Sequence, residues 1–178
     1  YFSLQTQSQD PRLSAYYGAG VVPGNTPVNA VPMVAVDFET TGFNPMQDAI
    51  VSIGLVPFSL QRIYCREAAY WVVKPDQALS KESVIIHGIT HAEVSAAPTI
   101  EGILADLLRK LAGRVVVVHY RHIEQEFLSQ ALQNMFKEGL QFPVIDTMEL
   151  ERRALSGRQG LINKLLRRPA GSVQLSSC

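Results

Sequence analysis

The feature that most constrains the fold is a short apolar run that ends in two acidic residues. Residues 33–38 are rich in valine, follow Pro32, and predict a buried β-strand. Because side chains alternate along a strand, Asp37 and Glu39 are expected on the same face. Two carboxylates this close repel each other unless a cation or a shared proton lies between them. An acidic surface turn is the ordinary alternative, but such a turn has no reason to follow a core strand so abruptly. The run therefore predicts a divalent-metal site at the end of a strand.

The composition is that of one folded domain of ordinary size. The chain has 178 residues, 47% of them hydrophobic, and its 16 basic and 16 acidic residues cancel. Whole-chain charge therefore gives no support for nucleic-acid binding, although it leaves room for a local basic surface. Cys65 and Cys178 are too few for a disulfide framework or a zinc site, and they fit a reducing compartment. The sequence contains no membrane-length apolar run and opens without a basic-then-apolar signal segment. We expect a cytoplasmic protein without a membrane partner.

Residues 1–31 differ from the rest of the chain. They are dense in Gly and Pro and show no helical periodicity, whereas Tyr16 and Tyr17 argue against free disorder. We expect an extended N-terminal arm that lies on the domain, with one short helix near 11–17. A docking segment for a partner is the alternative. The remaining residues, 32–178, are expected to form one domain.

The order of the expected elements indicates an α/β domain with a mixed five-stranded sheet. Three strands joined by short intervals resemble an antiparallel meander, and the all-valine run that follows is typical of a parallel neighbour buried on both faces. Helical stripes and caps place helices before and after that run, so we expect helices on both faces of the sheet. The expected strands are 33–38, 49–56, 63–73, 115–118 and 142–145, and the expected helices are 80–86, 98–111, 121–137 and 146–155, with Asp146 as a cap.

Glu124 is an acidic residue at a position where the helical pattern predicts a buried side chain. On a helix over 121–137 it falls in the middle of the apolar stripe, between Phe127 and Leu128. A buried carboxylate needs a cation, strong donors or a proton. One interpretation is that Arg121, one turn back, neutralises it. The other is that Glu124 lies near the strand-end carboxylates, so that three of them converge on a divalent cation, with Mg²⁺ favoured because it prefers oxygen ligands.

Two histidines and a basic segment are also candidates. His119 closes the valine strand and could face the same cleft, although a lone histidine is more often a hydrogen-bonded structural residue. His87 is expected in a loop near the cleft, able to contact substrate. The arginines and lysine of 151–168 form either a solvated helix face or an edge of the cleft that contacts phosphates.

With these residues in view, the chain resembles the DEDD 3′–5′ exonucleases, in particular the epsilon-like proofreading branch associated with DNA polymerase III. The first motif of that superfamily is similar to Asp37-Phe38-Glu39-Thr40-Thr41-Gly42. The segments 83–90, ending in His-Gly-Ile-Thr, and 144–147, Val-Ile-Asp-Thr, agree with the same branch. The resemblance covers about residues 32–155 and implies a ribonuclease-H-like fold.

The resemblance also implies a chemistry. Two ions, Mg²⁺ or Mn²⁺, would bind at Asp37, Glu39 and Glu124, with Glu124 in the place of the second-motif aspartate. A nucleic-acid 3′ end, DNA or RNA, would enter over Thr40, Thr41 and Gly42. Phe38, His87 and His119 complete the set of expected substrate-binding residues. Hydrolysis by a two-metal mechanism would release nucleoside monophosphates, and a DNA polymerase or another replication or repair protein would be the expected partner.

Three departures from the family pattern shape the prediction. The second motif has Glu124 where the family has Asp, and the third motif is absent, because no His follows His122 and no Asp follows Asp146. The final helix that the fold needs is also missing, so we expect a longer protein that continues beyond Cys178. The third-motif histidine would be the general base, so the 178-residue piece alone is expected to be nearly inactive. The alternative is a module that grips 3′ ends, or serves a polymerase as an accessory domain, without cutting.

Overall fold

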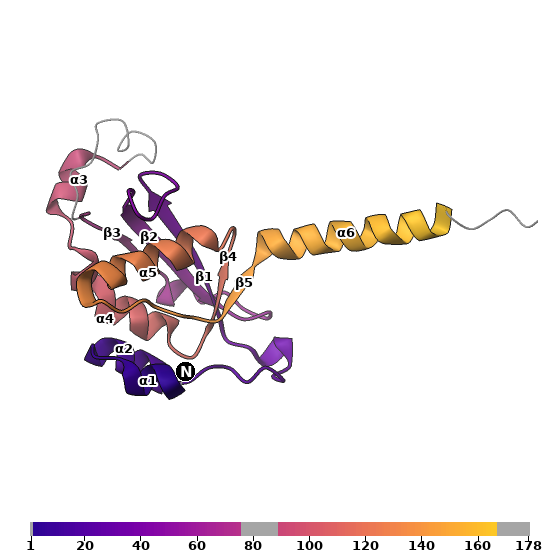
Figure 1. Cartoon of the computed structure of the whole chain (residues 1–178), viewed down its shortest axis with the longest axis horizontal. Helices are drawn as coiled ribbons and strands as arrows, with labels where there is room; N and C mark the ends of the chain where they lie inside the picture. The colour runs from indigo at the N-terminus through magenta and orange to yellow at the C-terminus, as the bar shows by residue number, and fades with distance from the viewer. Residues whose placement is uncertain (1, 76–88, 167–178) are drawn as a thin grey trace, which may run out of the picture.

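A computed structural model describes residues 2–75 and 89–166, and these form a five-stranded sheet with helices (Figure 1). The strand order is β3-β2-β1-β4-β5. Strands β1 to β3 are antiparallel, whereas β4 pairs in parallel with β1 and β5. The strands are β1 (Met33–Thr40), β2 (Ile50–Phe58), β3 (Ala69–Val72), β4 (Val115–Val118) and β5 (Val144–Asp146). The helices are α1 (Phe2–Gln7), α2 (Pro11–Gly18), α3 (His91–Ala96), α4 (Ile100–Leu111), α5 (His122–Phe136) and α6 (Thr147–Leu166). The mixed α/β sheet expected from the sequence is confirmed, but α4 and α5, expected among helices on both faces, lie on the same face.

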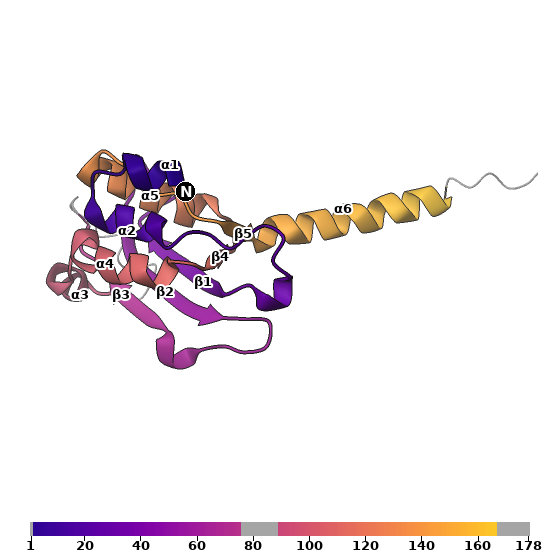
Figure 2. The same ribbon diagram turned by 90° about the horizontal axis from the view of Figure 1, so that it is seen from below.

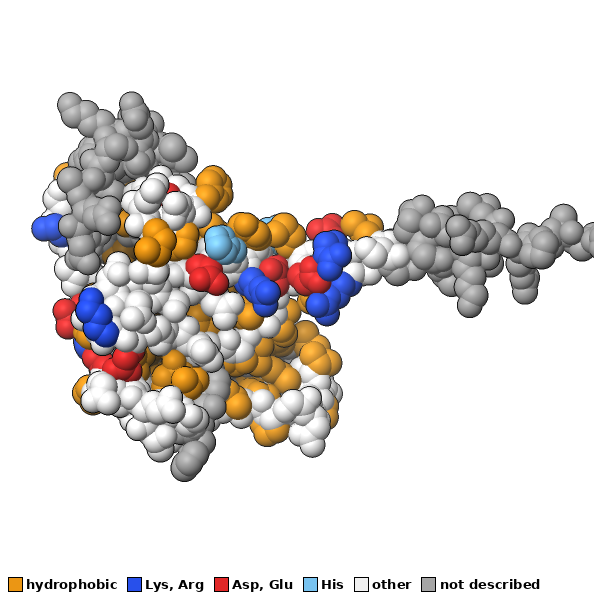
Figure 3. Space-filling view, viewed as in Figure 1, with side chains coloured by type: hydrophobic (Ala, Val, Ile, Leu, Met, Phe, Trp, Pro, Cys, Tyr) orange, Lys and Arg blue, Asp and Glu red, His pale blue; other side chains and the backbone are white. Residues whose placement is uncertain are grey.

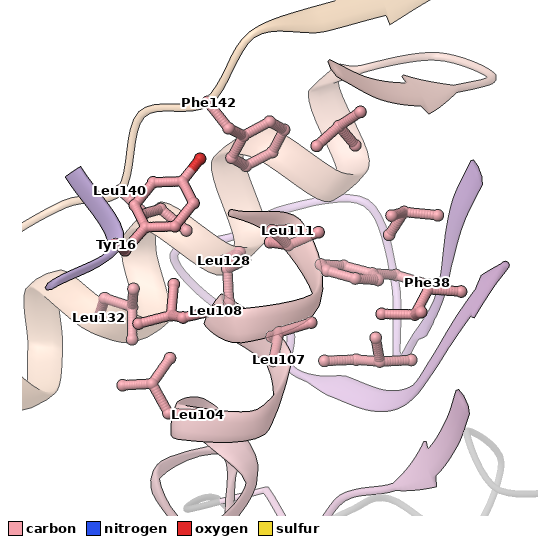
Figure 4. Close-up of a cluster of buried hydrophobic side chains, with 14 of the residues drawn as sticks. Tyr16, Phe38, Leu104, Leu107, Leu108, Leu111, Leu128, Leu132, Leu140 and Phe142 are labelled. Carbon is pink, nitrogen blue, oxygen red and sulfur yellow. The ribbon is translucent and has the colours of Figure 1, made fainter. Parts of the chain in front are cut away.

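The core lies on one face of the sheet. Alternation along β1 buries Val34, Val36 and Phe38 on this face, and α4 and α5 cover them. Figure 4 shows Leu107 and Leu111 of α4 toward Phe38, with Leu128 and Leu132 of α5 in the same cluster, and Figure 2 shows α1, α2, α4 and α5 on the same side of the sheet. Helix α4 forms because its leucines recur at helical spacing, Thr99 caps its start and Gly113, at φ +67°, follows its end. Ala35 and Asp37 point to the other face, where they are half-buried and exposed respectively.

The N-terminal segment is part of the folded domain. The short helix expected near 11–17 is present as α2, and a second helix, α1, precedes it, so the segment is a helical pair and not an extended arm. Leu13, Tyr16 and Tyr17 are buried in the common core. The Glu138 carboxylate accepts hydrogen bonds from the Ser8 hydroxyl and from the backbone N–H groups of residues 9 and 10. Burial of these apolar side chains within the chain leaves them unavailable to a docking partner.

Some expected elements differ in length. The third strand covers only Ala69–Val72, because residues 65–67 form a 3₁₀ turn and Ile63 makes one isolated bridge with Phe58. The valine strand is fully buried on one face only, since Val115 and Val117 are half-buried. Helix α3 was not predicted as a helix, although Thr90 and Glu93 form a capping box that the sequence spacing could have revealed. The expected helix over 80–86 and His87 lie outside the described residues.

Helix α6 continues well past the expected end at 155 and extends away from the sheet (Figure 1). Acidic and basic side chains gather at its base (Figure 3), where Arg152 and Arg153 both pair with Glu149. Among the residues that the structure describes, no helix is long and apolar enough to cross a membrane.

Candidate active site

Strand pairing brings the start of α5, which carries Glu124, toward the end of β1, which carries Asp37 and Glu39. Strand β4 lies parallel to β1 with Ala35 beside Val117, so both strands run toward the same edge of the sheet. Asp37 is near the end of β1, and α5 begins four residues after β4 ends. Glu124 is in the first turn of α5 and therefore approaches β1 close to Asp37. The parallel pairing expected of the valine strand is present, and β1 is one of its two neighbours.

Glu124 is buried as the helical projection predicted, with 2% of its surface exposed. Its Oε2 atom has no hydrogen-bond partner. Burial raises the pKa of Glu124 to about 7, and the negative charges of Asp37 and Asp146 add to this rise. The backbone N–H groups of Glu124 itself and Phe38 act in the opposite direction, because they favour the ionised carboxylate. Arg121 is not among the main causes of this shift, so the structure does not support the interpretation in which Arg121 neutralises Glu124.

The strand carboxylates are more accessible than the helix carboxylate. Asp37 is exposed and Glu39 half-buried, and the β1–β2 register shifts between Glu39 and Thr40. Irregularities of this kind re-aim side chains at the end of a strand. A shallow groove on this face is lined by Asp37, Gly54 and Tyr70 among others. One side of the site is therefore open to a large ligand.

The carboxylates of the site are suitable ligands for a hard divalent cation. The side chains that the structure describes do not, however, form a complete metal site. Carboxylate oxygens are the ligands that Mg²⁺ and Mn²⁺ prefer, and a cation would relieve a buried carboxylate oxygen that has no partner and feels the negative charge of Asp37. Among the described side chains, no three from His, Cys, Asp or Glu lie close enough together to hold a metal ion. The roles of Asp37, Glu39 and Glu124 as ligands stay a prediction.

The turn after β1 is held by a residue that sequence reasoning missed. Asp48 accepts a hydrogen bond from the Thr41 hydroxyl at 3.2 Å and from the Asn44 N–H at 2.9 Å. Thr41 Oγ1 accepts in turn from the Ala49 N–H, at 3.0 Å. The Asp48 carboxylate fills the space where a side chain at position 42 would begin, which explains the glycine there. No local sequence signal marks Asp48, because its partners are known only once the turn is folded.

The remaining predicted residues have different surroundings. The side chain of Phe38 is 7% exposed and belongs to the core, so only its backbone faces the site. Thr40 donates to the Gly42 carbonyl at 2.6 Å. His119 is exposed and its Nδ1 lies 3.0 Å from the Thr147 hydroxyl, as expected for a structural histidine. Their roles in substrate binding stay predictions.

The comparisons with known proteins agree with this architecture. The exonuclease family RNase_T matches residues 34–171. The DNA polymerase III epsilon subunit of Treponema pallidum is 31% identical over 127 residues, which cover 71% of this chain and 58% of that protein. The DNA polymerase III PolC-type protein of Thermotoga petrophila is 30% identical over 125 residues, 70% of this chain. The matched region is only 9% of that polymerase, so the chain spans a small part of its PolC-type relatives.

Solved structures support the fold. Escherichia coli exonuclease I in a single-stranded DNA complex superimposes with a TM-score of 0.62 at 17% identity, covering 72% of this chain and 31% of that one. Exonuclease X in complex with 5′-overhanging duplex DNA gives 0.55 at 24% identity, covering 80% of each chain. The fold is thus the ribonuclease-H-like fold of the DEDD exonucleases. The chain belongs to the RNase_T exonuclease family, and its curated relatives include epsilon and PolC-type proteins of DNA polymerase III.

Proposed function

We propose that this chain is the core of a divalent-metal-dependent 3′–5′ exonuclease that hydrolyses phosphodiester bonds at nucleic-acid 3′ ends and releases nucleoside monophosphates. The observation that carries the proposal is the buried Glu124 carboxylate, whose Oε2 has no partner and whose pKa rises in part because of the negative charge of Asp37 on β1. A structural role explains this arrangement poorly, because an unpartnered buried carboxylate destabilises the fold. Membership of the exonuclease family supports the same function.

In this proposal, different residues bind the metal ions, guide the substrate and exclude water. Asp37, Glu39 and Glu124 would hold Mg²⁺ or Mn²⁺, and a bound divalent cation would activate water and stabilise the leaving oxygen. The exposed Asp37 side leaves room for the terminal nucleotide, and the turn held by Asp48 would guide the 3′ end over Thr40 and Thr41. Glu124 reaches the site from the buried side and would close it against bulk water on that side.

The test uses the full-length protein and a single-stranded oligonucleotide labelled near its 5′ end. With Mn²⁺ present, we expect stepwise shortening from the 3′ end, and we expect Asp37→Ala and Glu124→Gln each to lower the rate by at least about 100-fold. Asp106→Asn is the matched control, because Asp106 lies on α4 and pairs with Arg109, away from the site. A wild-type protein that releases no mononucleotide would overturn the proposal.

A second function is favoured by one observation: among the side chains that the structure describes, no three form a metal site. The chain would then retain the fold and grip 3′ ends without cutting them, or act as an accessory domain of a polymerase. Fluorescence anisotropy with the same oligonucleotide separates the two functions. Binding that is unchanged in Asp37→Ala, together with no turnover in wild type, would establish the binding function.

A further inference from the structure

Asp146 lies where the ends of two strands and the starts of two helices meet. It is the last residue of β5, and in the parallel register it stands beside Val118, the last residue of β4. Helix α6 begins at the next residue, and the turn into α5 begins at the residue after Val118. A short side chain at this position can therefore reach both helix starts.

The carboxylate of Asp146 accepts backbone hydrogen bonds from both. Its Oδ1 accepts from Met148 N at 3.0 Å and from Glu149 N at 3.4 Å, as an ordinary cap of α6. The same oxygen accepts from Tyr120 N at 3.2 Å, and Oδ2 accepts from Arg121 N at 3.1 Å. Arg121 stands at the capping position of α5 and makes no side-chain cap of its own. The start of α5 is thus capped by a residue 25 positions further along the chain.

The turn that Asp146 holds is strained. Tyr120 has φ +76°, in the left-handed region that a bulky residue rarely adopts, and such a conformation persists only where neighbouring contacts impose it. A second link acts on the same turn: Thr147 donates its hydroxyl proton to the Val118 carbonyl at 2.9 Å. Because the only hydroxyl proton of Thr147 is donated to Val118, the hydroxyl oxygen must accept in its contact with His119. The His119 ring therefore donates from Nδ1.

This turn fixes where Glu124 lies. Glu124 is in the first turn of α5, only three residues after Arg121, so a change in the turn moves its carboxylate relative to Asp37. We propose that Asp146 is a positioning residue for the carboxylate site: by capping α5 and α6 together, it holds Glu124 opposite Asp37. The proposal rests on the proposed function for its activity readout, but the position of Glu124 is measurable without activity.

The experiment compares three variants of the full-length protein. Asp146→Ala removes all four acceptor contacts. Asp146→Asn removes the charge but retains one acceptor oxygen, enough for the contacts of Oδ1. Asp106→Asn on α4 removes a carboxylate charge outside this junction and is the matched control. Changes in groups that orient metal ligands typically lower activity by about 10–100-fold. We therefore expect about a tenfold or larger loss of Mn²⁺-dependent 3′-end degradation in Asp146→Ala, a smaller loss in Asp146→Asn, and none in Asp106→Asn.

Two readouts separate positioning from general stability. The first is the exchange rate of the Tyr120 and Arg121 amide protons, which should rise in Asp146→Ala while exchange in β1 and β2 stays unchanged. The second is the carboxyl-carbon NMR resonance of Glu124 at low pH, where protonation of the acids removes charge effects. That resonance should move in Asp146→Ala and stay nearer its wild-type position in Asp146→Asn.

The outcomes distinguish the two proposals. An unchanged Glu124 resonance and unchanged amide exchange in Asp146→Ala would overturn the positioning role, whatever the activity. Equal effects of the Asn and Ala variants would also overturn it, because charge and not capping would then be the cause. If wild type degrades nothing while both NMR readouts change as expected, the proposed function fails and the positioning role stands.

Discussion

The two sides of the candidate site are held in place by different kinds of turn. On the strand side, Asp48 holds the turn after β1 through Thr41 and Asn44, residues seven and four positions away. On the helix side, Asp146 holds the turn before α5 through Tyr120 and Arg121, which lie 26 and 25 positions away. The strand-side turn accommodates its aspartate with a glycine, whereas the helix-side turn forces a tyrosine to positive φ. The contacts of Asp48 close a short loop, whereas those of Asp146 with Tyr120 and Arg121 close a much longer one and depend on the pairing of β4 with β5.

The carboxylates beside these two turns differ in how far they are exposed to solvent. Asp37, beside the local turn, is exposed, and its charge is largely solvated. Glu124, beside the long-range turn, is buried without a partner for one of its oxygens. The free-energy cost of the site is therefore concentrated on the helix side, and the largest stability effects are expected there.

The largest effect should be a pH dependence of stability in metal-free protein. The pKa of Glu124 is about 7 in the folded protein, against 4.5 for an unperturbed glutamate, so the folded state binds more protons than the unfolded state between these values. The free energy of unfolding should therefore fall as the pH rises from about 4.5 to about 7, by about 3 kcal/mol in total. Urea unfolding in EDTA measures this. Glu124→Gln should flatten the dependence, whereas Asp37→Asn, on the exposed side, should leave most of it. A dependence that persists unchanged in Glu124→Gln would contradict the assignment.

A smaller effect should separate the two aspartates. Asp146→Ala removes caps from two helices and should lower the free energy of unfolding by about 2 kcal/mol. Asp48→Ala removes one side-chain anchor of a local turn and should cost about 1 kcal/mol. Both are measured by urea unfolding at a single fixed pH. If Asp48→Ala proved the more destabilising, the contrast between local and long-range anchoring would be wrong.

A change in stability no larger than that of Asp48→Ala is expected when the glycine of the strand-side turn is replaced. A methyl group at position 42 would overlap the Asp48 carboxylate, so Gly42→Ala should cost about 1 kcal/mol by displacing it from Thr41 and Asn44. The double variant Gly42→Ala/Asp48→Ala should be less destabilised than the sum of the single variants, because the overlap is gone. A thermal melt of the wild type, the two single variants and the double variant completes this cycle. Strict additivity would mean that Asp48 does not explain the glycine.

The sequence determined the parts of the fold that depend on local patterns. The alternation in β1, the leucine stripe of α4 and the position of Glu124 within the apolar stripe of α5 all follow from periodicity, and the structure confirms each. The expectation that Asp146 caps its own helix rests on an equally local pattern and is also confirmed. The helical pair in residues 2–18 was only half predicted, because Leu13 and Tyr16 gain their helical environment by packing on α4 and not from a periodic pattern.

How these elements meet depends on contacts between distant parts of the chain. The pairing of β1 with β4 and of β4 with β5 brings Asp37, Glu124 and Asp146 to one edge of the sheet from distant positions in the chain. No local signal records that Asp146 also caps α5. Periodicity along a chain states which face of an element is buried, whereas the partner of a polar group is fixed by strand register, and register becomes visible only when the whole sheet is assembled.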